Sequence, residues 1–332
     1  SNHNFSKGFF YVADGTFNFY DTEKKTAYQD CYASLNAGKT LGIGNYDSAN
    51  IIHSNGKFYL LVGTSTSNRD HFYIVDAKTL YYENSAVVGA NLSGLTILNE
   101  QYGLVTGDGI RRIDLKSLNN VRIKNERLLC FYNSIIYNGK VLSNDTYKDE
   151  SKVKYYDVNE LIAAKEGEAP AVTELDIIQK QKINFVLAKD GNVYTLESAD
   201  NGCNIVKIKN DFTLEKVFAN FQPAKGPYHS SPTIGMVASE TENIIYLVST
   251  DGAIYKYILG DSDSLKAPFI AAESGVSITA PLQLNQQSGE LYVTYTEERK
   301  DESKIVVYSK DGKVLHTVDC GESVPSQILF NN

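Results

Sequence analysis

The chain has 332 residues and a net charge of −8, from 32 Lys and Arg against 40 Asp and Glu. This acidic balance lacks the basic footprint of sequence-independent nucleic-acid binding, so no nucleic-acid partner is expected. No apolar run approaches the roughly 18 residues that a membrane-spanning helix needs, so no transmembrane segment is expected. The 23 Tyr and 14 Phe, with no Trp and one Met, favour a strand-rich protein.

One phrase recurs along the whole chain. It is a polar turn, usually with glycine, followed by a run of aromatic and β-branched residues. Its seven occurrences lie at residues 8–12, 56–62, 101–105, 139–142, 191–196, 242–248 and 289–294. A second phrase follows, in which a short β run leads through a polar turn into another β run; its clearest copies lie at residues 17–21, 72–80, 110–118, 153–161 and 305–312.

These phrases predict the fold. Alternating apolar residues broken by Gly, Asp and Asn turns indicate antiparallel strands. Four strands per unit and a period of roughly 47 residues are typical of a β-propeller rather than a sandwich. Units two to seven each have an inner strand before the first phrase, at residues 49–53, 96–98, 134–137, 184–188, 233–238 and 281–284. One helix-like stretch interrupts the pattern at residues 158–167.

The first unit has almost nothing ahead of Gly8 that could serve as its inner strand, whereas the C-terminus supplies an unpartnered β run at residues 325–330. Pairing the two leaves no open edge. We therefore predict an all-β, seven-bladed β-propeller of four-stranded antiparallel blades, closed by the C-terminal strand in blade one and forming a single domain over residues 1–332. The predicted blades span residues 8–42 with 324–330, 47–88, 92–129, 132–178, 182–220, 230–271 and 277–320.

Loops between the second and third strands of each blade should share a face with the blade-to-blade crossings. Three blades have minimal hairpins there, at Asp14-Gly15, Asp108-Gly109 and Asp251-Gly252, because Asp-Gly suits a two-residue turn with positive φ. The other four blades have longer polar loops at residues 63–70, 143–152, 198–202 and 296–303. Uneven loops on a rigid scaffold suggest that this face contacts a partner; drift of solvated loops is the alternative.

The crossings on this face carry the candidate site. Flat amphipathic rings and cationic side chains would surround a mouth suited to a polar organic ligand. The candidate ligand-binding residues are Tyr46, Arg69, Tyr132, Lys182, Tyr228 and His229. The alternative is that these rings only pack the crossings.

Catalytic and metal-binding signatures are mostly missing. The five His are scattered, with no HExxH motif, and neither a GxSxG elbow nor a phosphate-binding glycine loop occurs. Cys31, Cys130, Cys203 and Cys320 form no CxxC pair and are expected to be buried free thiols. No catalytic residue, metal ligand or cofactor is assigned. His229 with Glu322 or Asp47 is the one cluster that could supply a general base.

The segments 10–15, 41–42 and 72–80 resemble the YVTN-type surface propellers, a group of surface-layer or cell-surface proteins of gut Bacteroidales. The resemblance implies an exported seven-bladed propeller at the cell surface or in the periplasm, often lipid-anchored as a lipoprotein precursor. Related surface propellers capture corrinoids beside an outer-membrane transporter. Here Trp is absent, and no corrinoid-contacting motif can be mapped residue by residue.

The leading hypothesis is an exported, non-enzymatic propeller that binds a small polar ligand, corrinoid-like or glycan, or an outer-membrane partner protein. A propeller-type lyase or lactonase with a site at the channel mouth is the first alternative. A structural surface-layer or adhesion component is the second.

Overall fold

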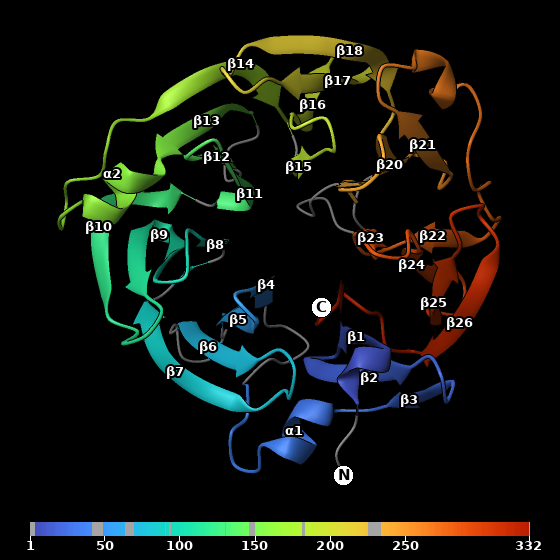
Figure 1. The fold of residues 1–332 in the computed structure, drawn as a ribbon, viewed down its shortest axis with the longest axis horizontal. Helices are drawn as coiled ribbons and strands as arrows, with labels where there is room; N and C mark the ends of the chain where they lie inside the picture. Colours follow the sequence, from blue (N-terminus) through green and yellow to red (C-terminus); the bar gives the residue numbers. More distant parts are fainter. Residues whose placement is uncertain are drawn as a thin grey trace. The chain divides into compact units, whose positions relative to one another are not determined.

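The computed structural model describes residues 4–41, 49–63, 70–89, 91–92, 94–129, 131–145, 150–180, 183–224 and 234–331. Contacts group the chain into two compact units. Unit 1 comprises Ser1–Leu175 and Leu329–Asn332, and unit 2 comprises Asp176–Ile328. Each unit is built from successive antiparallel sheets, which Figure 1 colours in chain order from blue to red.

Four sheets lie wholly or mostly in unit 1, with strand orders β27-β1-β2-β3, β4-β5-β6-β7, β10-β9-β8 and β11-β12-β13-β14. Their strands are β1 (Gly8–Ala13), β2 (Thr16–Asp21), β3 (Thr26–Tyr28), β4 (Ala49–Ser54), β5 (Lys57–Val62), β6 (Asp70–Asp76), β7 (Tyr82–Gly89), β8 (Gly94–Ile97), β9 (Tyr102–Asp114), β10 (Asn120–Leu129), β11 (Phe131–Tyr137), β12 (Lys140–Asp145), β13 (Ser151–Asp157), β14 (Thr173–Gln179) and β27 (Gln327–Leu329).

Unit 2 contains three sheets, with orders β15-β16-β17-β18, β19-β20-β21 and β22-β24-β25-β26, the last also carrying β23 on β24. Their strands are β15 (Val186–Leu187), β16 (Val193–Ala199), β17 (Gly202–Ile208), β18 (Leu214–Phe221), β19 (Met236–Ala238), β20 (Ile244–Val248), β21 (Ile254–Ile258), β22 (Val276–Ile278), β23 (Gln283–Leu284), β24 (Leu291–Glu297), β25 (Ser303–Tyr308) and β26 (Val314–Gly321).

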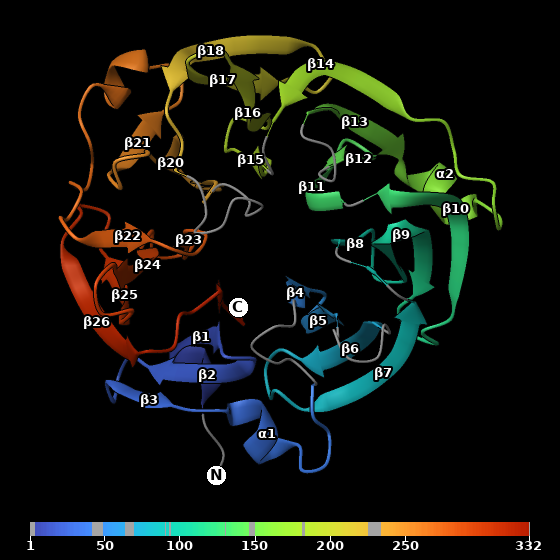
Figure 2. The same cartoon turned by 180° about the vertical axis from the view of Figure 1, so that it is seen from behind.

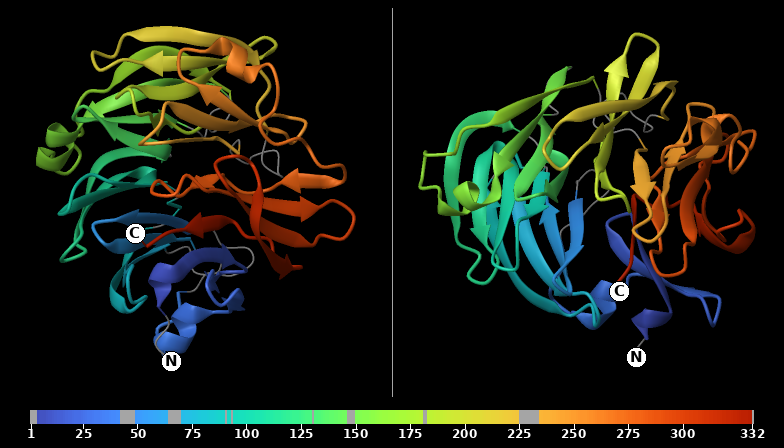
Figure 3. Two further views of the ribbon diagram at one scale, coloured as in Figure 1. Left: turned by 45° about the vertical axis from the view of Figure 1, so that its right-hand side comes forward. Right: turned by 45° about the horizontal axis from the view of Figure 1, so that its top comes forward.

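The seven sheets confirm the predicted all-β, seven-bladed β-propeller fold. In the described parts of the chain, helix is limited to four short segments (Figure 3): η1 (Phe5–Lys7), α1 (Cys31–Leu35), α2 (Val158–Ala163) and η2 (Ser262–Leu265). The helix α2 was predicted, and α1 was not. None of the helices in the described ranges is long and apolar enough to span a membrane.

The sheet of β8, β9 and β10 has four strand segments in space, because β9 folds back on itself. An extended strand of 13 residues would span about 40 Å. Yet the backbone N–H of Leu115 donates to the carbonyl of Gln101 at 2.8 Å, so the chain has reversed between them. Gly107 and Gly109 have φ values of 142° and 86°. The reversal therefore lies at residues 107–109, as the Asp108-Gly109 pair predicts.

The other predicted turns divide into tight and long ones. The two-residue turn predicted at Asp251-Gly252 is wrong, since Val248 pairs with Ile254 and five residues connect them. Asp14 and Gly15, with φ of 51° and 73°, form a two-residue turn between paired Ala13 and Thr16. The loop expected at residues 198–202 is wrong, since Ala199 pairs with Gly202 and leaves a two-residue turn. Residues 297–302 form a long loop between paired Thr296 and Ser303, as predicted.

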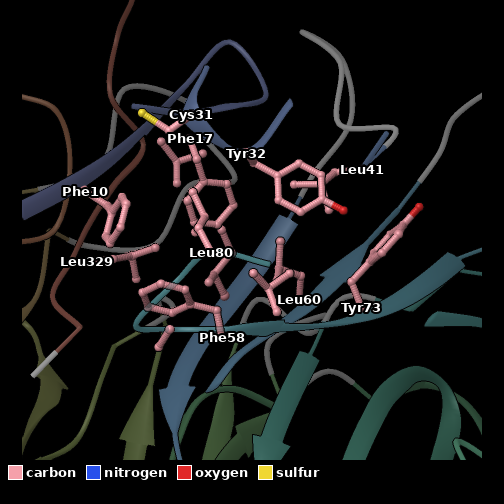
Figure 4. Packing of buried hydrophobic residues seen from close by; sticks show 14 of the residues in the cluster. Phe10, Phe17, Cys31, Tyr32, Leu41, Phe58, Leu60, Tyr73, Leu80 and Leu329 are labelled. Carbon is pink, nitrogen blue, oxygen red and sulfur yellow. The ribbon is translucent and has the colours of Figure 1, made fainter. Parts of the chain in front are cut away.

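The predicted pairing of the tail with the head is confirmed. The strand β27 lies beside β1 as the fourth strand of the sheet β27-β1-β2-β3. Ile328 and Leu329 are 1% and 6% exposed. Leu329 belongs to the same buried cluster as Phe10 (Figure 4). The tail therefore supplies both a strand for the edge of β1 and apolar side chains for the core.

Cores form where the face of one sheet packs against the next within a unit. In unit 1, Figures 1 and 2 show the sheets of β5 and β9 side by side, and Tyr59 and Leu61 of β5 share a buried cluster with Val105 and Ile113 of β9. In the cluster between the β1 and β5 sheets, Phe10 meets Phe58 edge to face, with ring centroids 5.7 Å apart. Alternation along each strand gives every inner strand two such faces.

A repeated aspartate turn explains the second sequence phrase. Asp76 Oδ1 accepts the backbone N–H groups of Lys78 and Thr79, and Asp114 Oδ1 accepts those of Lys116 and Ser117. The turns end on buried leucines with φ of 64° and 62°, at Leu80 and Leu118. In the copy at residues 153–161, Asp157 instead accepts from the N–H of Glu160 and caps α2.

These turns predict a dependence of stability on pH. Although burial acts the other way, the hydrogen bonds from Thr79 hold the pKa of Asp76 below its ordinary value, and the N–H of Ser117 does so for Asp114. A lowered folded pKa adds stability that is complete above the unfolded value of about 3.9 and is lost as the pH falls through the folded pKa. We expect the double variant Asp76→Asn/Asp114→Asn to lose less stability than the parent between about pH 5 and pH 2.

Urea unfolding at a series of pH values measures this difference, and equal slopes for the parent and variant would contradict it. Alanine at either position should cost about 1 kcal/mol at pH 7, as the loss of a side-chain cap does. Asp263→Asn is the control. The Asp263 carboxylate is exposed, and within the described chain its one ion pair is with Lys266, at 3.0 Å.

Candidate functional site

The residues predicted to bind a ligand fall where the structure gives no side chain. Tyr132 lies in β11, whose backbone is described there while the side chain is not. The other five lie outside the described residues: Tyr46, Arg69, Lys182, Tyr228 and His229. Of the hypothetical general-base cluster, Glu322 is an exposed residue after β26, and Asp47 lies outside the described residues. Both assignments stay predictions.

In unit 2, the crossing between β18 and β19 shows the predicted arrangement, in which crossings and second-to-third strand turns lie on one face. The segment that leaves β18 toward β19 contacts the second-to-third strand turns of both neighbouring sheets. The Gln222 side chain donates through Nε2 to the carbonyl of Asn201, in the turn between β16 and β17. The N–H of Thr250, in the turn between β20 and β21, donates to the carbonyl of Gln222 at 2.8 Å. Crossing and turns therefore share one face in this unit.

A pocket of about 500 Å³ opens at this crossing. We call it the β18 pocket. It lies between the outer strand of the β15–β18 sheet and the turn that joins β20 to β21, which Figure 1 shows in yellow and orange. Its described lining consists of Phe218, Asn220, Phe221, Gln222, Ser249, Thr250, Asp251, Tyr255 and Leu265.

The aromatic floor of the β18 pocket depends on a β-bulge. Phe218 and Phe221 are three residues apart, and in a regular strand they would point to opposite faces. The register places Phe221 opposite Cys203 but Phe218 opposite Ile205, so β18 carries one extra residue between them. Asn220 takes that irregular position with φ of 62°. Both rings therefore turn toward the next sheet, where they join the same cluster.

Tyr255 and Leu265 complete the floor. The Tyr255 ring meets Phe221 edge to face, with centroids 6.0 Å apart and an interplanar angle of 87°. Leu265 ends the short helix η2 and is 8% exposed. Asp261 caps that helix by accepting the N–H of Asp263, so the run of Asp and Ser at residues 261–264 holds a turn in place.

The rim of the β18 pocket is polar. Asn220, Gln222, Thr250 and Asp251 are exposed beside the aromatic floor. The Thr250 hydroxyl donates to the carbonyl of Pro223 at 3.1 Å, which ties the turn to the crossing. The rim therefore offers amide and hydroxyl groups, which can both donate and accept hydrogen bonds.

The described lining carries one ionisable group that is charged at neutral pH, the Asp251 carboxylate, and no Lys or Arg. Oδ1 of Asp251 accepts from the Ser249 hydroxyl and from the N–H of Ala253, the latter at 3.1 Å. The Ser249 hydrogen bond is the main cause of a lowered Asp251 pKa, so this group is ionised at neutral pH. An anionic ligand would meet repulsion here.

The metal-binding and thiol groups of the described chain do not gather into a site. Among the described residues, no group of three or more His, Cys, Asp or Glu is placed to hold a metal ion. His53 lies in β4 with its ring 5.3 Å from that of Phe58, and burial lowers its pKa. Cys31 and Cys203 are buried free thiols, as predicted, whereas Cys320 is a free thiol that is only partly buried, and Cys130 lies outside the described residues.

The β18 pocket was missed at the level of sequence. The signal was the pair of rings at Phe218 and Phe221, followed by Gln222 and Pro223. A proline just after a strand marks its end, and two aromatic residues three apart fit a strand only if it bulges. Neither observation identifies the neighbouring turn that closes the pocket.

The sheets and the β18 pocket define a β-propeller with a small-molecule-sized pocket at a blade crossing. Residues 5–331 match the family described as a domain of unknown function, DUF5074. Since the match spans nearly the whole chain, the protein belongs to this family. No curated protein matches the chain.

Solved structures support the fold. A functionally unknown protein from Desulfotomaculum acetoxidans is 13% identical, with 98% of this chain and 99% of that one covered and a TM-score of 0.59. Hsv2 of Kluyveromyces lactis is 10% identical, with 98% and 96% covered and a TM-score of 0.52. The dihydro-heme d1 dehydrogenase NirN, in complex with DHE, is 12% identical, with 97% and 65% covered and a TM-score of 0.53. At these identities the likeness shows the fold alone.

Proposed function

We propose that the protein is a binding module for a small, neutral, polyhydroxylated ligand, a saccharide unit, and that the β18 pocket holds it. One observation carries the proposal: three aromatic rings and a polar rim surround a pocket of about 500 Å³. Small-molecule sites are typically concave and apolar, about 300–1,000 Å³ in volume, and contain a few polar groups that orient the ligand.

The charge of the pocket selects the ligand class. Its described lining has one carboxylate and no cationic side chain, which disfavours phosphates and carboxylates. Asn220 matches a hydroxyl group of a ligand, because both partners donate and accept, and the side-chain oxygens of Gln222 and Thr250 can accept from such a group while their donors bind Asn201 and Pro223. Phe218, Phe221 and Tyr255 line the pocket and supply apolar area for the C–H face of a sugar ring.

Binding of neutral mono- and disaccharides, measured by titration calorimetry after a glycan-array screen, tests the proposal. Tyr255→Ala removes part of the floor and should weaken binding at least about ten-fold. Asn220→Gly removes one rim amide while keeping a residue that tolerates φ of 62°. It should weaken binding about two- to ten-fold, the value of one neutral hydrogen bond.

Asn138→Gly is the matched control, because Asn138 also has a positive φ, of 46°, but lies in the turn between β11 and β12. It should leave saccharide binding unchanged. The proposal fails if no neutral saccharide binds, or if both pocket variants bind as tightly as the parent. Circular dichroism of the Tyr255→Ala variant separates loss of the floor from loss of the fold.

Export to the cell surface or periplasm, with a lipid anchor in the precursor, is part of the proposal and rests on the resemblance to YVTN-type surface propellers. The same resemblance motivates corrinoids as the alternative ligand and an outer-membrane protein as a partner. Corrinoids therefore belong in the screen. Cell fractionation with surface proteolysis tests the location.

A further inference from the structure

Two arginines in unit 1 lie directly opposite each other in the sheet of β9 and β10. Arg111 of β9 is the register partner of Arg122 of β10. Directly opposed residues of an antiparallel pair share a face, and like charges in that arrangement are destabilising. Arg112, the next residue, alternates to the other face and donates to the carbonyls of Leu161 and Ala164 at 2.9 and 2.6 Å.

The pair holds more positive charge than its described neighbours neutralise. Arg122 Nη2 donates to Asp108 Oδ1 at 3.0 Å. Arg111 Nη1 donates to the neutral amide oxygen of Asn120 at 3.0 Å. In the described chain, the Nε atoms of both arginines are enclosed and have no hydrogen-bond acceptor. Two guanidinium groups thus share one close carboxylate.

Two glycines lie close to these guanidinium groups, although the positive φ of each, and the Lys124 carbonyl beside Gly109, also require glycine there. A Cβ atom built on Gly89 would lie 3.1 Å from Arg111 Nε, and one built on Gly109 would lie 3.0 Å from Arg122 Nε. Any larger residue at either glycine would crowd its arginine. The Arg122 side chain remains 29% exposed, and Arg111 is half-buried, so the pair is accessible from solvent.

Burial, and then the neighbouring charge of Arg122, lower the pKa of Arg111, while Asp108 opposes them. Arginine stays protonated at physiological pH even so. A half-buried charge without full compensation is costly, and a bound anion would supply the missing charge.

We propose that Arg111 and Arg122 form a binding site for a phosphate-class oxyanion, either inorganic phosphate or the phosphate group of an organic molecule. Guanidinium groups present planar pairs of N–H donors that match the oxygens of phosphate, and charge-assisted hydrogen bonds of this kind are among the stronger ones in proteins. The site is independent of the β18 pocket, whose described lining belongs to unit 2 and lacks cationic residues.

Titration of the full chain with inorganic phosphate in 150 mM sodium chloride, followed by calorimetry and by phosphorus NMR, tests the site. We expect saturable binding, and we expect Arg111→Gln and Arg122→Gln each to weaken it at least ten-fold. Arg111→Lys keeps the charge without the planar fork and should fall between the parent and Arg111→Gln. Glycerol phosphate in a parallel titration distinguishes a phosphate ester from the free ion by its relative affinity.

Arg299→Gln is the matched control, since Arg299 is an exposed arginine in the loop between β24 and β25. It removes one charge and should leave phosphate binding unchanged. Phosphate should also raise the melting temperature of the parent but not of the Gln variants. Absence of saturable binding to the parent, or parental affinity in both Gln variants, would overturn the proposal and leave the two arginines a purely structural pair.

Discussion

Replacing Phe10 with alanine is expected to lower the free energy of unfolding by about 3–5 kcal/mol. Phe10 is fully buried, and its ring centroid lies 5.0 Å from that of Phe5, 5.2 Å from that of Phe19 and 5.7 Å from that of Phe58. Truncation removes the transfer free energy of the ring and leaves a cavity among aromatic neighbours, which cannot collapse easily because Phe19 and Phe58 are held in strands and Phe5 in the short helix η1.

Urea unfolding followed by circular dichroism and tyrosine fluorescence measures the loss, because the chain has no Trp. Tyr81→Ala is the control, since its side chain is 48% exposed and should change stability by no more than about 0.5 kcal/mol. A loss below about 1 kcal/mol for Phe10→Ala would show that this cluster does not hold the β1 and β5 sheets together.

Ending the chain after residue 325 is the second change with a large expected effect. It removes β27, including Ile328 at 1% and Leu329 at 6% exposure. Losing a buried Leu or Ile side chain alone typically costs about 2–5 kcal/mol. The truncation also exposes the edge of β1, and an unpaired edge can add a strand from another molecule. We expect a lower midpoint of urea unfolding and concentration-dependent self-association.

The matched control ends after Phe330, which keeps all of β27. It should unfold at nearly the parental urea concentration and stay monodisperse at the parental level in light scattering. If the chain ending after residue 325 matched this control in both measurements, the tail would contribute no stability to the β1 sheet.

The fold was predictable because its signals are local. Each strand shows its period-two pattern within a few residues, and several tight turns show an Asp-Gly or Asn-Gly pair, as at Asp14-Gly15 and Asn138-Gly139. The pairing of the C-terminal tail with β1 was also predictable from the number of expected strands. The first sheet lacked an inner strand, and the β run at residues 325–330 had no sheet of its own. The helix α1 was missed because it has only five residues, too few to show a helical period, and the Asp30 side chain before it makes no capping hydrogen bond.

The candidate sites were less predictable because they depend on contacts between distant segments. From the sequence, the ligand-binding site was predicted at the blade-to-blade crossings. The structure describes none of the side chains that were predicted to bind a ligand there. The β18 pocket instead needs the bulge at Asn220 and a turn about 30 residues further along the chain. The register of Arg111 and Arg122 depends likewise on which residues of β9 and β10 pair.

Hydrophobic alternation and turn chemistry act over a few residues, so the repeating unit, the strand-rich class and the strand that completes the first sheet could all be predicted from the order of residues. Which side chains meet depends instead on how distant strands pair and pack. A single extra residue in β18 turned Phe218 and Phe221 to one face, and backbone pairing set two arginines opposite each other. In a β-sheet the side-chain period is two, so a one-residue change of register reverses every contact while the sequence pattern stays almost the same.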